Sequence, residues 1–290
     1  MKAGYVTIIG LPNVGKSTFM NRILGQKLSI VSKKPQTTRH RIIGILTEGE
    51  TQVVFTDTPG VIRPKYSLQE MMVQSINRAL SGADIVLLMV AATKDPDEED
   101  IQLIEKLKGL PTIVAINKID LIKKERLLPI IDFYRRNRID EVFPISALYG
   151  DGVDELKRKI LDSLPEGDFY YPEDLLTEHP ERFFVCEIIR EKIFERYQEE
   201  IPYATTVEID EFTERSEGKY YIRAVVYVER KSQKGIIIGK KGRMLKEVGT
   251  EARQAIEEFL NHPVYLDLWV KVKEGWRRKS DKVKELGYRP

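Results

Sequence analysis

The sequence predicts an α/β domain with a mostly parallel sheet and helices on both faces, followed by a smaller α+β domain. Up to about residue 165, short runs rich in Val and Ile alternate with amphipathic stretches. An acidic, proline-containing segment follows at 166–181, and the order of patterns after it is different. At 290 residues the chain is long enough for two domains with separate cores. We therefore expect domains at 1–165 and 182–290, joined by a linker at 166–181.

Five runs in the first domain have the length and composition of strands. Their nearly continuous apolarity is typical of parallel strands covered on both faces. They lie at Tyr5–Ile9, Val53–Thr56, Ile85–Ala91, Thr112–Ile116 and Val142–Ile145. The stretches that predict the covering helices lie at Leu68–Leu80, Glu98–Leu107, Glu125–Arg136 and Val153–Leu164. A run at Arg41–Thr47, followed by a turn around Gly49, predicts one antiparallel edge hairpin.

The second domain has a different order of elements, namely a helix, two strands, two helices and a strand. In chain order we expect them at Arg182–Glu199, Thr205–Thr213, Tyr220–Arg230, Ser232–Ile238, Arg243–Leu260 and Val264–Val272. This order indicates a small α+β unit.

The composition favours a protein of the cytoplasm. Apolar residues make up 42% and charged residues 32% of the chain, which is usual for soluble globular proteins. No apolar run approaches the ~20 residues that a membrane-spanning helix needs. The beginning of the chain, MKAGYVTIIG, lacks the features of a signal peptide. The single cysteine, Cys186, cannot form an internal disulfide, which fits a reducing compartment.

Basic residues are concentrated in one segment, although the formal net charge is only +2. Residues 230–246 contain seven Lys and Arg and no acid, whereas residues 166–181 contain six Asp and Glu and no Lys or Arg. A basic patch of the kind that binds polyanions can therefore exist within a nearly neutral total.

Residues 10–17 read GLPNVGKS and match the phosphate-binding pattern G-x-x-x-x-G-K-[ST], between a predicted strand and a predicted helix. In such a loop the backbone N–H groups wrap the β-phosphate, the lysine reaches the β- and γ-phosphates, and the hydroxyl binds magnesium. Lys16 and Ser17 hold the last two positions. We expect nucleotide contacts from Gly10, Leu11, Pro12, Asn13, Val14, Gly15, Lys16, Ser17 and Thr18.

Three further motifs follow predicted strands, at the edge where open α/β sheets bind ligands. They are Asp57-Thr58-Pro59-Gly60, Asn117-Lys118-Ile119-Asp120 and Ser146-Ala147-Leu148. Asp57 can hold magnesium through water, and the Gly60 N–H can meet the γ-phosphate. Together with the first loop, these motifs resemble the translation-factor-like branch of P-loop GTPases over about residues 3–165. The resemblance implies that Asp120 accepts hydrogen bonds from guanine and that the loop at 146–148 donates a backbone N–H to the guanine carbonyl.

The segment Lys33–Arg41 lies where such GTPases keep their first mobile switch, in which a threonine closes on magnesium. Either Thr37 or Thr38 can be that ligand. Related GTPases favour Thr38, because they place the ligand directly before an arginine. We expect His40 to lie on the surface.

The residue after Gly60 is Val61, and the chain has no glutamine there to orient the attacking water. We therefore expect slow intrinsic hydrolysis of GTP, with the water positioned by backbone groups or by a partner. In some related GTPases an asparagine at the position of Asn13 helps to bind potassium. The residues to which we assign catalytic roles are Lys16, Thr38, Gly60 and Asn13.

A second glycine loop, Gly239-Lys240-Lys241-Gly242, lacks the spacing of a nucleotide loop. It lies between two predicted helices and resembles the GXXG loop of KH domains, and the order of elements around it is that of the type II KH domain of bacterial proteins. The resemblance implies binding of single-stranded RNA across this loop. The residues expected to contact RNA are Lys234, Gly239, Lys240, Lys241, Gly242 and Arg243.

The two tryptophans are assigned different roles. Trp276 lies beside Arg277 and Arg278, and this pairing of an aromatic ring with cations suits contact with RNA. Packing of the tail onto its own domain is an alternative that the sequence supports equally well. Trp269 lies in an apolar predicted strand, and we expect it in the core.

Over essentially its whole length the chain resembles the Era family of bacterial GTPases, because PQTTR, DTPG, NKID, SAL and GKKG occur in the family's order. The resemblance implies a P-loop GTPase domain followed by a type II KH domain, with GTP or GDP and magnesium as ligands. It also implies a monomer that binds small-subunit (16S) ribosomal RNA near its 3′ end, assists maturation of the 30S subunit and associates peripherally with the inner membrane. The alternative is a constitutive RNA-binding module whose GTPase domain does not gate RNA affinity.

Overall fold

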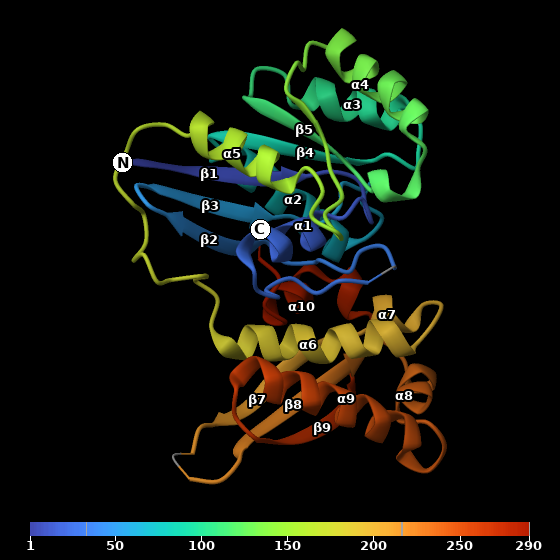
Figure 1. Cartoon of the computed structure of the whole chain (residues 1–290). Helices are drawn as coiled ribbons and strands as arrows, with labels where there is room; N and C mark the ends of the chain where they lie inside the picture. The colour runs from blue at the N-terminus through green and yellow to red at the C-terminus, as the bar shows by residue number, and fades with distance from the viewer. Residues whose placement is uncertain (33, 216, 290) are drawn as a thin grey trace. The chain divides into compact units, whose positions relative to one another are not determined.

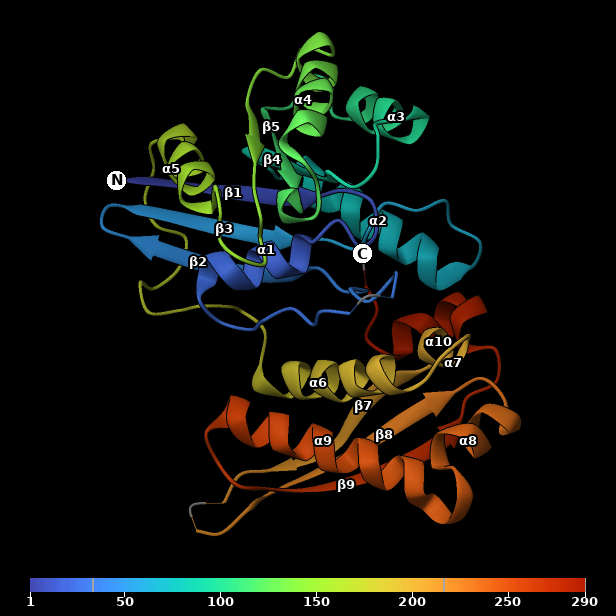
Figure 2. The ribbon, with the colours of Figure 1, turned by 45° about the vertical axis from the view of Figure 1, so that its right-hand side comes forward.

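A computed structural model describes residues 1–32, 34–215 and 217–289 and divides the chain into two compact units. The first comprises Met1–Arg63 and Met72–Glu178, and the second comprises Pro64–Met71 and His179–Arg289. Figures 1 and 2 show the elements of both units from two directions.

The first unit is built on a six-stranded sheet in the order β2-β3-β1-β4-β5-β6. The bounds of the strands are Lys2–Ile9 (β1), Ile42–Glu48 (β2), Thr51–Asp57 (β3), Ile85–Ala91 (β4), Thr112–Asn117 (β5) and Val142–Pro144 (β6). All neighbouring strands are parallel except β2 and β3, which pair antiparallel. The mostly parallel sheet and its antiparallel edge hairpin are therefore confirmed.

Helices connect these strands, and three of them share a core with the middle of the sheet. The helices are α1 (Lys16–Leu24), α2 (Ser67–Ser81), α3 (Glu98–Lys106), α4 (Leu127–Arg136) and α5 (Val153–Ser163), with short 3₁₀ turns at Ile119–Leu121 (η1) and Lys124–Arg126 (η2). Apolar side chains of α2, α3 and α4 pack with those of β4 and β5 in one buried cluster. Helix α1 packs on β2 and β3, and α5 packs on β3.

The acidic segment that the sequence predicts as a linker is bound along the β2–β3 hairpin over much of its length. The buried Gln52 side chain accepts hydrogen bonds from the N–H groups of Tyr170 (2.9 Å) and Tyr171 (3.0 Å) and donates one to the Tyr171 carbonyl. The Ile45 N–H donates to the Leu176 carbonyl at 2.8 Å. Side chains of this segment also pack on the hairpin, because the segment contains apolar residues among its acids. The two units divide after Glu178, within the segment expected as a linker.

The second unit has a three-stranded sheet in the order β7-β8-β9. Its elements are α6 (Glu181–Arg196), α7 (Ile201–Ala204), β7 (Thr206–Thr213), β8 (Tyr220–Val228), α8 (Lys231–Ile238), η3 (Lys240–Gly242), α9 (Arg243–Leu260), β9 (Val264–Val272), η4 (Trp276–Arg278) and α10 (Ser280–Glu285). Strand β7 is antiparallel and β9 parallel to β8. The predicted order of helix, two strands, two helices and strand is thus confirmed, with α7, η4 and α10 added.

One face of this sheet is covered by α6 and by the amphipathic helix α9, whose apolar side chains form a single core with β8 and β9. Helix α6 also holds a buried ion pair, in which the Arg190 Nε donates to a Glu187 carboxylate oxygen at 2.8 Å. Within the described residues, no helix has the length and apolarity required to cross a membrane.

Candidate nucleotide and RNA sites

The phosphate loop of the first unit joins β1 to α1, and its two glycines are needed for steric reasons. A Cβ atom on Gly10 would lie 2.2 Å from the Met89 carbonyl oxygen. Gly15 has φ of +104°, and a Cβ atom there would lie 2.2 Å from the Asn117 side-chain nitrogen. Both positions therefore exclude any larger residue, because the backbone must pass directly beside the neighbouring strands.

Lys16 is folded back into this loop. Its side chain is only 6% exposed, and Nζ donates to the carbonyl oxygens of Gly10 (3.2 Å) and Leu11 (3.0 Å). Burial lowers the pKa of Lys16 to about 8, and the nearby Asp57 carboxylate partly opposes this shift. The loop thus keeps an ammonium group where the phosphates of a nucleotide would lie.

Three oxygen-bearing side chains converge beside Lys16. The Ser17 hydroxyl donates to Asp57 Oδ2 at 2.7 Å and lies 2.9 Å from the Thr38 hydroxyl. Asp57 is fully buried at the end of β3, and burial raises the pKa of its carboxyl. Its other oxygen, Oδ1, has no hydrogen-bond partner among the described residues. The adjacent Thr37 instead donates its hydroxyl to the Lys34 carbonyl at 2.7 Å.

This cluster fits a magnesium ion. Hard oxygen ligands and a partly unsatisfied carboxylate suit Mg²⁺, which usually keeps waters and binds one or two carboxylates together with substrate phosphates. Within the part of the chain that the structure describes, no group of three or more His, Cys, Asp or Glu side chains forms a separate metal site. A magnesium ion would therefore be held by the hydroxyls of Ser17 and Thr38 and by the carboxylate of Asp57.

The motif that follows β3 packs directly on the phosphate loop. The Thr58 hydroxyl donates to the Ile8 carbonyl at 2.7 Å, and the Val61 N–H donates to the Gly10 carbonyl at 3.0 Å. A Cβ atom on Gly60 would lie 2.8 Å from Pro12. Glycine at this position thus allows the second motif to approach the first.

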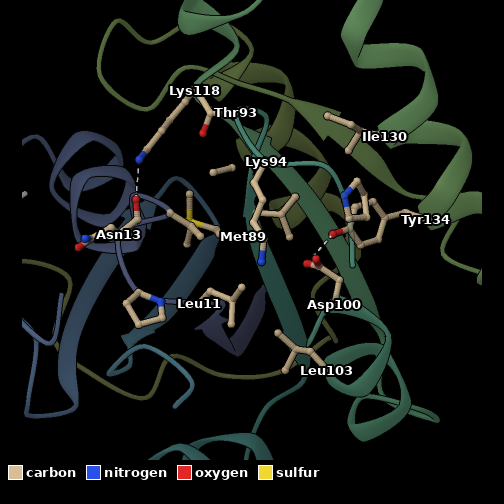
Figure 3. A pocket seen from close by; sticks show the side chains of 15 residues that line it. Leu11, Asn13, Met89, Thr93, Lys94, Asp100, Leu103, Lys118, Ile130 and Tyr134 are labelled. Atoms are coloured by element: carbon tan, nitrogen blue, oxygen red, sulfur yellow. Dashed lines mark hydrogen bonds between the residues drawn. The ribbon is translucent and has the colours of Figure 1, made fainter. Parts of the chain in front are cut away.

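Asn117 connects the remaining two motifs to the phosphate loop. Its side-chain nitrogen donates to the Val14 carbonyl at 2.8 Å, and its side-chain oxygen accepts from the Ala147 N–H at 2.8 Å. Lys118 Nζ donates to the Asn13 carbonyl at 2.6 Å (Figure 3). Three motifs that are far apart in the sequence therefore form one structure.

Asp120 lies at the exposed end of this structure. One of its carboxylate oxygens accepts a hydrogen bond from the buried Ser146 hydroxyl at 2.6 Å. The carboxylate is therefore held in a fixed orientation while it stays accessible to a ligand. Leu148, the last residue of its motif, is 58% exposed.

A cavity of about 220 Å³ lies beside the phosphate loop, on the side of β4, α3 and α4. Residues 11–14 and Lys118 form one wall, and on the opposite side the Tyr134 hydroxyl donates to Asp100 at 3.1 Å (Figure 3). The lining does not include Lys16, Ser17 or Asp57. The sequence interpretation did not single out Asp100, although it completes the capping box that begins α3 and such a box is readable from the acidic run.

The glycine loop of the second unit connects α8 to α9. Gly239 has φ of +70°, and a Cβ atom there would lie 2.5 Å from the Met244 side chain. Gly242 has φ of +77°. Lys240 and Lys241, between the glycines, are both exposed. The loop thus presents two cations with little side-chain bulk on either side.

Two further basic residues expected at this surface lie next to the loop. Arg243 is exposed at the start of α9 and makes an ion pair with Glu247 at 2.9 Å. Lys234 is half-buried on α8.

The tail residue Trp276 does not present its ring to solvent, so its predicted stacking on RNA is wrong. The side chain is fully buried, its indole N–H donates to the Ala204 carbonyl at 2.9 Å, and its ring stacks on Tyr288 at 5.8 Å. The alternative, packing of the tail onto its own domain, is what the structure shows. Arg277 is also mostly buried, in an ion pair with Glu229, so only Arg278 of this group is exposed.

Trp269, which the sequence places in the core, is instead 54% exposed. Side chains alternate between the two faces of a strand, and β9 directs Tyr265, Asp267 and Trp269 to the face away from the helices. The apolar neighbours of Trp269 on the strand suggested burial, but they occupy the opposite face.

Comparisons with known proteins agree with both units. A family model described as a 50S ribosome-binding GTPase matches residues 5–118, and a KH domain model matches residues 200–277. The chain is 44% identical to the GTPase Era of Ruminiclostridium cellulolyticum over 99% of this chain and 98% of that protein. It is 47% identical to a chloroplastic GTPase of Zea mays, ERA1, over 99% of this chain and 70% of that protein.

Two solved structures are similar over the full length of both chains. One is Era bound to MgGDPNP and nucleotides 1506–1542 of 16S ribosomal RNA, with a TM-score of 0.97 and 42% identity. The other is a single-residue variant of Aquifex aeolicus Era bound to GDP and AlF4⁻, with a TM-score of 0.96 and 42% identity. On the combined evidence of site geometry, domain order and full-length similarity, the chain belongs to the Era family of GTPases, with a P-loop GTPase domain followed by a KH domain.

Proposed function

We propose that the protein is a GTP-controlled RNA-binding switch that binds 16S ribosomal RNA near its 3′ end and assists maturation of the 30S subunit. The observation that carries this proposal is the presence, in one chain, of a magnesium-type cluster at Ser17, Thr38 and Asp57 and an exposed GXXG loop at 239–242. The Era structure solved with MgGDPNP and 16S ribosomal RNA nucleotides supports the same pair of ligands.

The nucleotide is held by groups with separate tasks. The backbone N–H groups of residues 13–18 surround the phosphates, and Lys16 Nζ moves from its loop carbonyls to the β- and γ-phosphates. Asp120, oriented by Ser146, accepts hydrogen bonds from the guanine N1 and exocyclic amine. The backbone at 146–148 meets the guanine carbonyl. Adenine offers no such pair of donors to Asp120, which explains a preference for GTP.

Magnesium would be bound by Ser17, by Thr38 and, through water, by Asp57. The 2.9 Å approach of Thr38 to Ser17 supports Thr38 over Thr37 as the switch ligand, since the Thr37 hydroxyl is engaged with the Lys34 carbonyl. Bound magnesium neutralises charge that develops on the phosphates. Its presence would also satisfy the buried Oδ1 of Asp57.

Hydrolysis relies on charge stabilisation rather than on a side-chain base. Lys16 stabilises the negative charge on the phosphoryl group during its transfer. Thr38 and Gly60 close on the γ-phosphate, and backbone groups or a partner position the attacking water. Val61 offers no side chain that could orient the water, so the intrinsic rate is slow. We further propose that potassium binds near Asn13, whose backbone has φ of +63°, and supplies additional positive charge. Equal hydrolysis rates in potassium and sodium would disprove that role.

The RNA strand crosses the loop between α8 and α9. Gly239 and Gly242 allow the sugar–phosphate backbone to approach closely, and Lys240 and Lys241 contact phosphates. Lys234 and Arg243 extend this basic surface, and Arg278, exposed on η4, stays a separate proposed contact. The burial of Trp276 removes it from the proposed contact set.

The switch is tested by measuring the affinity of the full chain for an RNA with the sequence of the 16S 3′ end, with GDP and with a nonhydrolysable GTP analogue. We expect the affinities to differ by about fivefold or more, which is the usual range of coupling between sites. Equal affinities would favour the alternative, a constitutive RNA-binding module. Gly239→Asp should abolish RNA binding while GTP hydrolysis without RNA is unchanged.

The cellular role is tested by crosslinking the protein to total RNA and sequencing the fragments, which should be enriched in the 16S 3′ end. We place the protein in the cytoplasm as a monomer, with a fraction held peripherally at the inner membrane by the basic segment 230–246. Salt should release that fraction from isolated membranes. Retention at high salt would contradict a charge-driven association.

A further inference from the structure

The sheet of the second unit has one face that its helices do not cover. Buried side chains of β8 and β9, such as Ile222, Ala224 and Val270, point toward the helices. Strand pairing places a second set of side chains on the other face, which we call the open sheet face. Its members are Glu208, Glu211, Thr213, Tyr221, Arg223, Tyr227, Tyr265, Asp267, Trp269 and Lys271, with Asp210 beside them at the bulge of β7. Thr206 and Val225 point to the same side, but both are buried.

Aromatic rings on the open sheet face are exposed but held in place. Tyr265 is 58% and Trp269 54% exposed. The Trp269 indole N–H donates to Asp267 at 2.9 Å, and the Tyr265 ring stacks on Tyr221 with 5.8 Å between centroids and 12° between planes. Rings that are already fixed lose little conformational entropy when a partner covers them. Exposed Trp and Tyr of this kind are the residues that dominate protein interfaces.

The charge of the open sheet face is acidic. It carries four carboxylates, from Glu208, Asp210, Glu211 and Asp267, against the two cations Arg223 and Lys271. A further cation, Lys273, lies 5.5 Å from the centre of the Tyr227 ring and is paired with Glu285 at 3.0 Å. Arg223 is surrounded by three of these carboxylates, at 3.4 Å from Asp267 and within 3.7 Å of the other two. Its charge is therefore already matched, and the surplus on this face is negative.

The same unit thus has two surfaces of opposite charge. The segment 230–246, which contains the GXXG loop, has seven basic residues and no acidic ones. Platforms that stack single-stranded nucleic acid combine aromatic rings with a positively charged groove. The open sheet face has the rings with a surplus of negative charge, so it disfavours RNA and favours a cationic ligand.

We propose that the open sheet face is a docking surface for an arginine- or lysine-bearing segment of a partner protein. A guanidinium or ammonium group lies over the exposed ring of Trp269 and is attracted by its face. A second cation of the segment can lie over Tyr265, four residues and about 13 Å away along β9. Asp267 lies between the two rings on β9, and Glu208 lies on β7 in the same cross-strand row as Trp269, with Val225 between them. Both carboxylates can balance the charge of the bound segment. The KH domain would then bind RNA by its GXXG loop and a basic protein segment by its sheet.

The test uses the full chain with a synthetic peptide of alternating arginine and glycine, and a glutamate–glycine peptide of equal length as the control. The chain has two tryptophans, and Trp276 is fully buried, so a change in indole fluorescence on titration reports chiefly on Trp269. We expect a saturable change with the arginine peptide and none with the glutamate peptide. A lysine–glycine peptide should bind as well, with a smaller fluorescence change.

Variants that replace carboxylates by amides test whether the arginine peptide binds to the open sheet face. Glu208→Gln combined with Asp267→Asn should lower the affinity for the arginine peptide by about tenfold at low salt. The affinity is measured from the anisotropy of a labelled peptide. Because Asp267 also holds Trp269, a second variant, Glu208→Gln with Glu211→Gln, removes two charges without disturbing that hydrogen bond. Glu258→Gln, on the exposed side of α9, is the matched control and should change nothing. Thermal melting checks that each variant is folded.

Two results would overturn the proposal. The first is an arginine-peptide affinity that both charge variants and Trp269→Ala leave unchanged. The second is a fluorescence change at Trp269 on addition of a single-stranded oligoribonucleotide to a Lys240→Glu, Lys241→Glu variant, because RNA would then be the ligand of the open sheet face.

Discussion

Lys16 and Asp57 illustrate how burial sets the charge of single side chains in the phosphate loop. Burial lowers the pKa of Lys16 to about 8 from its ordinary 10.5 and raises the pKa of the Asp57 carboxyl. Between about pH 8 and 10.5, the unfolded chain therefore binds more protons at Lys16 than the nucleotide-free native protein does. Through this group alone, the stability of the nucleotide-free protein increases with pH across that window.

Nucleotide affinity should change with pH in the opposite direction. Phosphate oxygens favour the charged ammonium, so binding raises the pKa of Lys16 and takes up a proton above about pH 8. The affinity for GDP should therefore fall as pH rises through that value. Calorimetry in buffers of different ionisation enthalpy measures the uptake directly. Lys16→Arg, which stays charged, should eliminate it, and an unchanged uptake in this variant would assign the proton to another group.

Asp120 should determine the choice of base. Asp120→Asn replaces a carboxylate, which accepts from the guanine N1 and amine, by an amide that suits xanthine. Loss of charge-assisted hydrogen bonds costs about 1.5–3 kcal/mol each, so GDP affinity should fall by at least about tenfold. Competition binding with GDP and XDP measures the exchange. Leu128→Ala, at an exposed side chain of α4 outside the nucleotide motifs, is the control.

At the scale of elements, α6 stands out because it holds a buried pair of opposite charges beside the apolar residues that it adds to the core of the second unit. Arg190 is 1% exposed and is hydrogen-bonded to the buried Glu187 one turn earlier. The guanidinium also lies 5.3 Å from the centre of the Phe194 ring. A buried charge pair is costly to desolvate, and breaking it is more costly still because one charge is left behind.

Glu187→Gln should therefore destabilise the protein strongly. We expect a loss of about 3–5 kcal/mol in the free energy of unfolding, since Arg190 would remain buried without its counter-ion. Glu195→Gln breaks the more exposed pair with Lys192 on the same helix and should cost at most about 1 kcal/mol. Denaturant unfolding of the two variants measures the difference, and similar losses would show that burial of the pair does not matter.

Strands and helices of the fold could be predicted well, but their faces could not. The period of apolar residues located β9 at Val264–Val272, as observed. It did not indicate which of the two faces of β9 the helices cover, and Trp269 was therefore assigned to the wrong one. Asp267, two residues earlier and on the same face, was the signal that could have corrected the assignment.

For the whole molecule, the separation of charge between segments predicts how RNA binding depends on salt. Each lysine that contacts a phosphate releases a counter-ion, and the slope of log affinity against log salt is about −0.7 per contact for single strands. Replacing Lys240 and Lys241 by Ala should therefore reduce the slope by about 1.4. Lys123→Ala with Lys124→Ala, on the first unit, should leave it unchanged. An equal effect of both pairs would mean that RNA binding is not centred on the GXXG loop.

The sequence by itself determined the chemistry of the nucleotide site, because each motif is a short local pattern that follows a strand. Gly10–Ser17, Asp57–Gly60, Asn117–Asp120 and Ser146–Leu148 all lie at the carboxyl edge of one sheet. Because parallel strands of one sheet end at the same edge, motifs that directly follow these strands lie at that edge.

Only the tertiary structure decided between alternatives that share a local pattern. Thr37 and Thr38 are adjacent, and it is the contact with Ser17, which lies 21 residues away in sequence, that favours Thr38 as the proposed magnesium ligand. Trp269 was assigned to the core and is exposed, and of the two roles left open for Trp276 long-range packing selected burial. Burial and pairing depend on chain segments that are distant in sequence, so no local period can determine them.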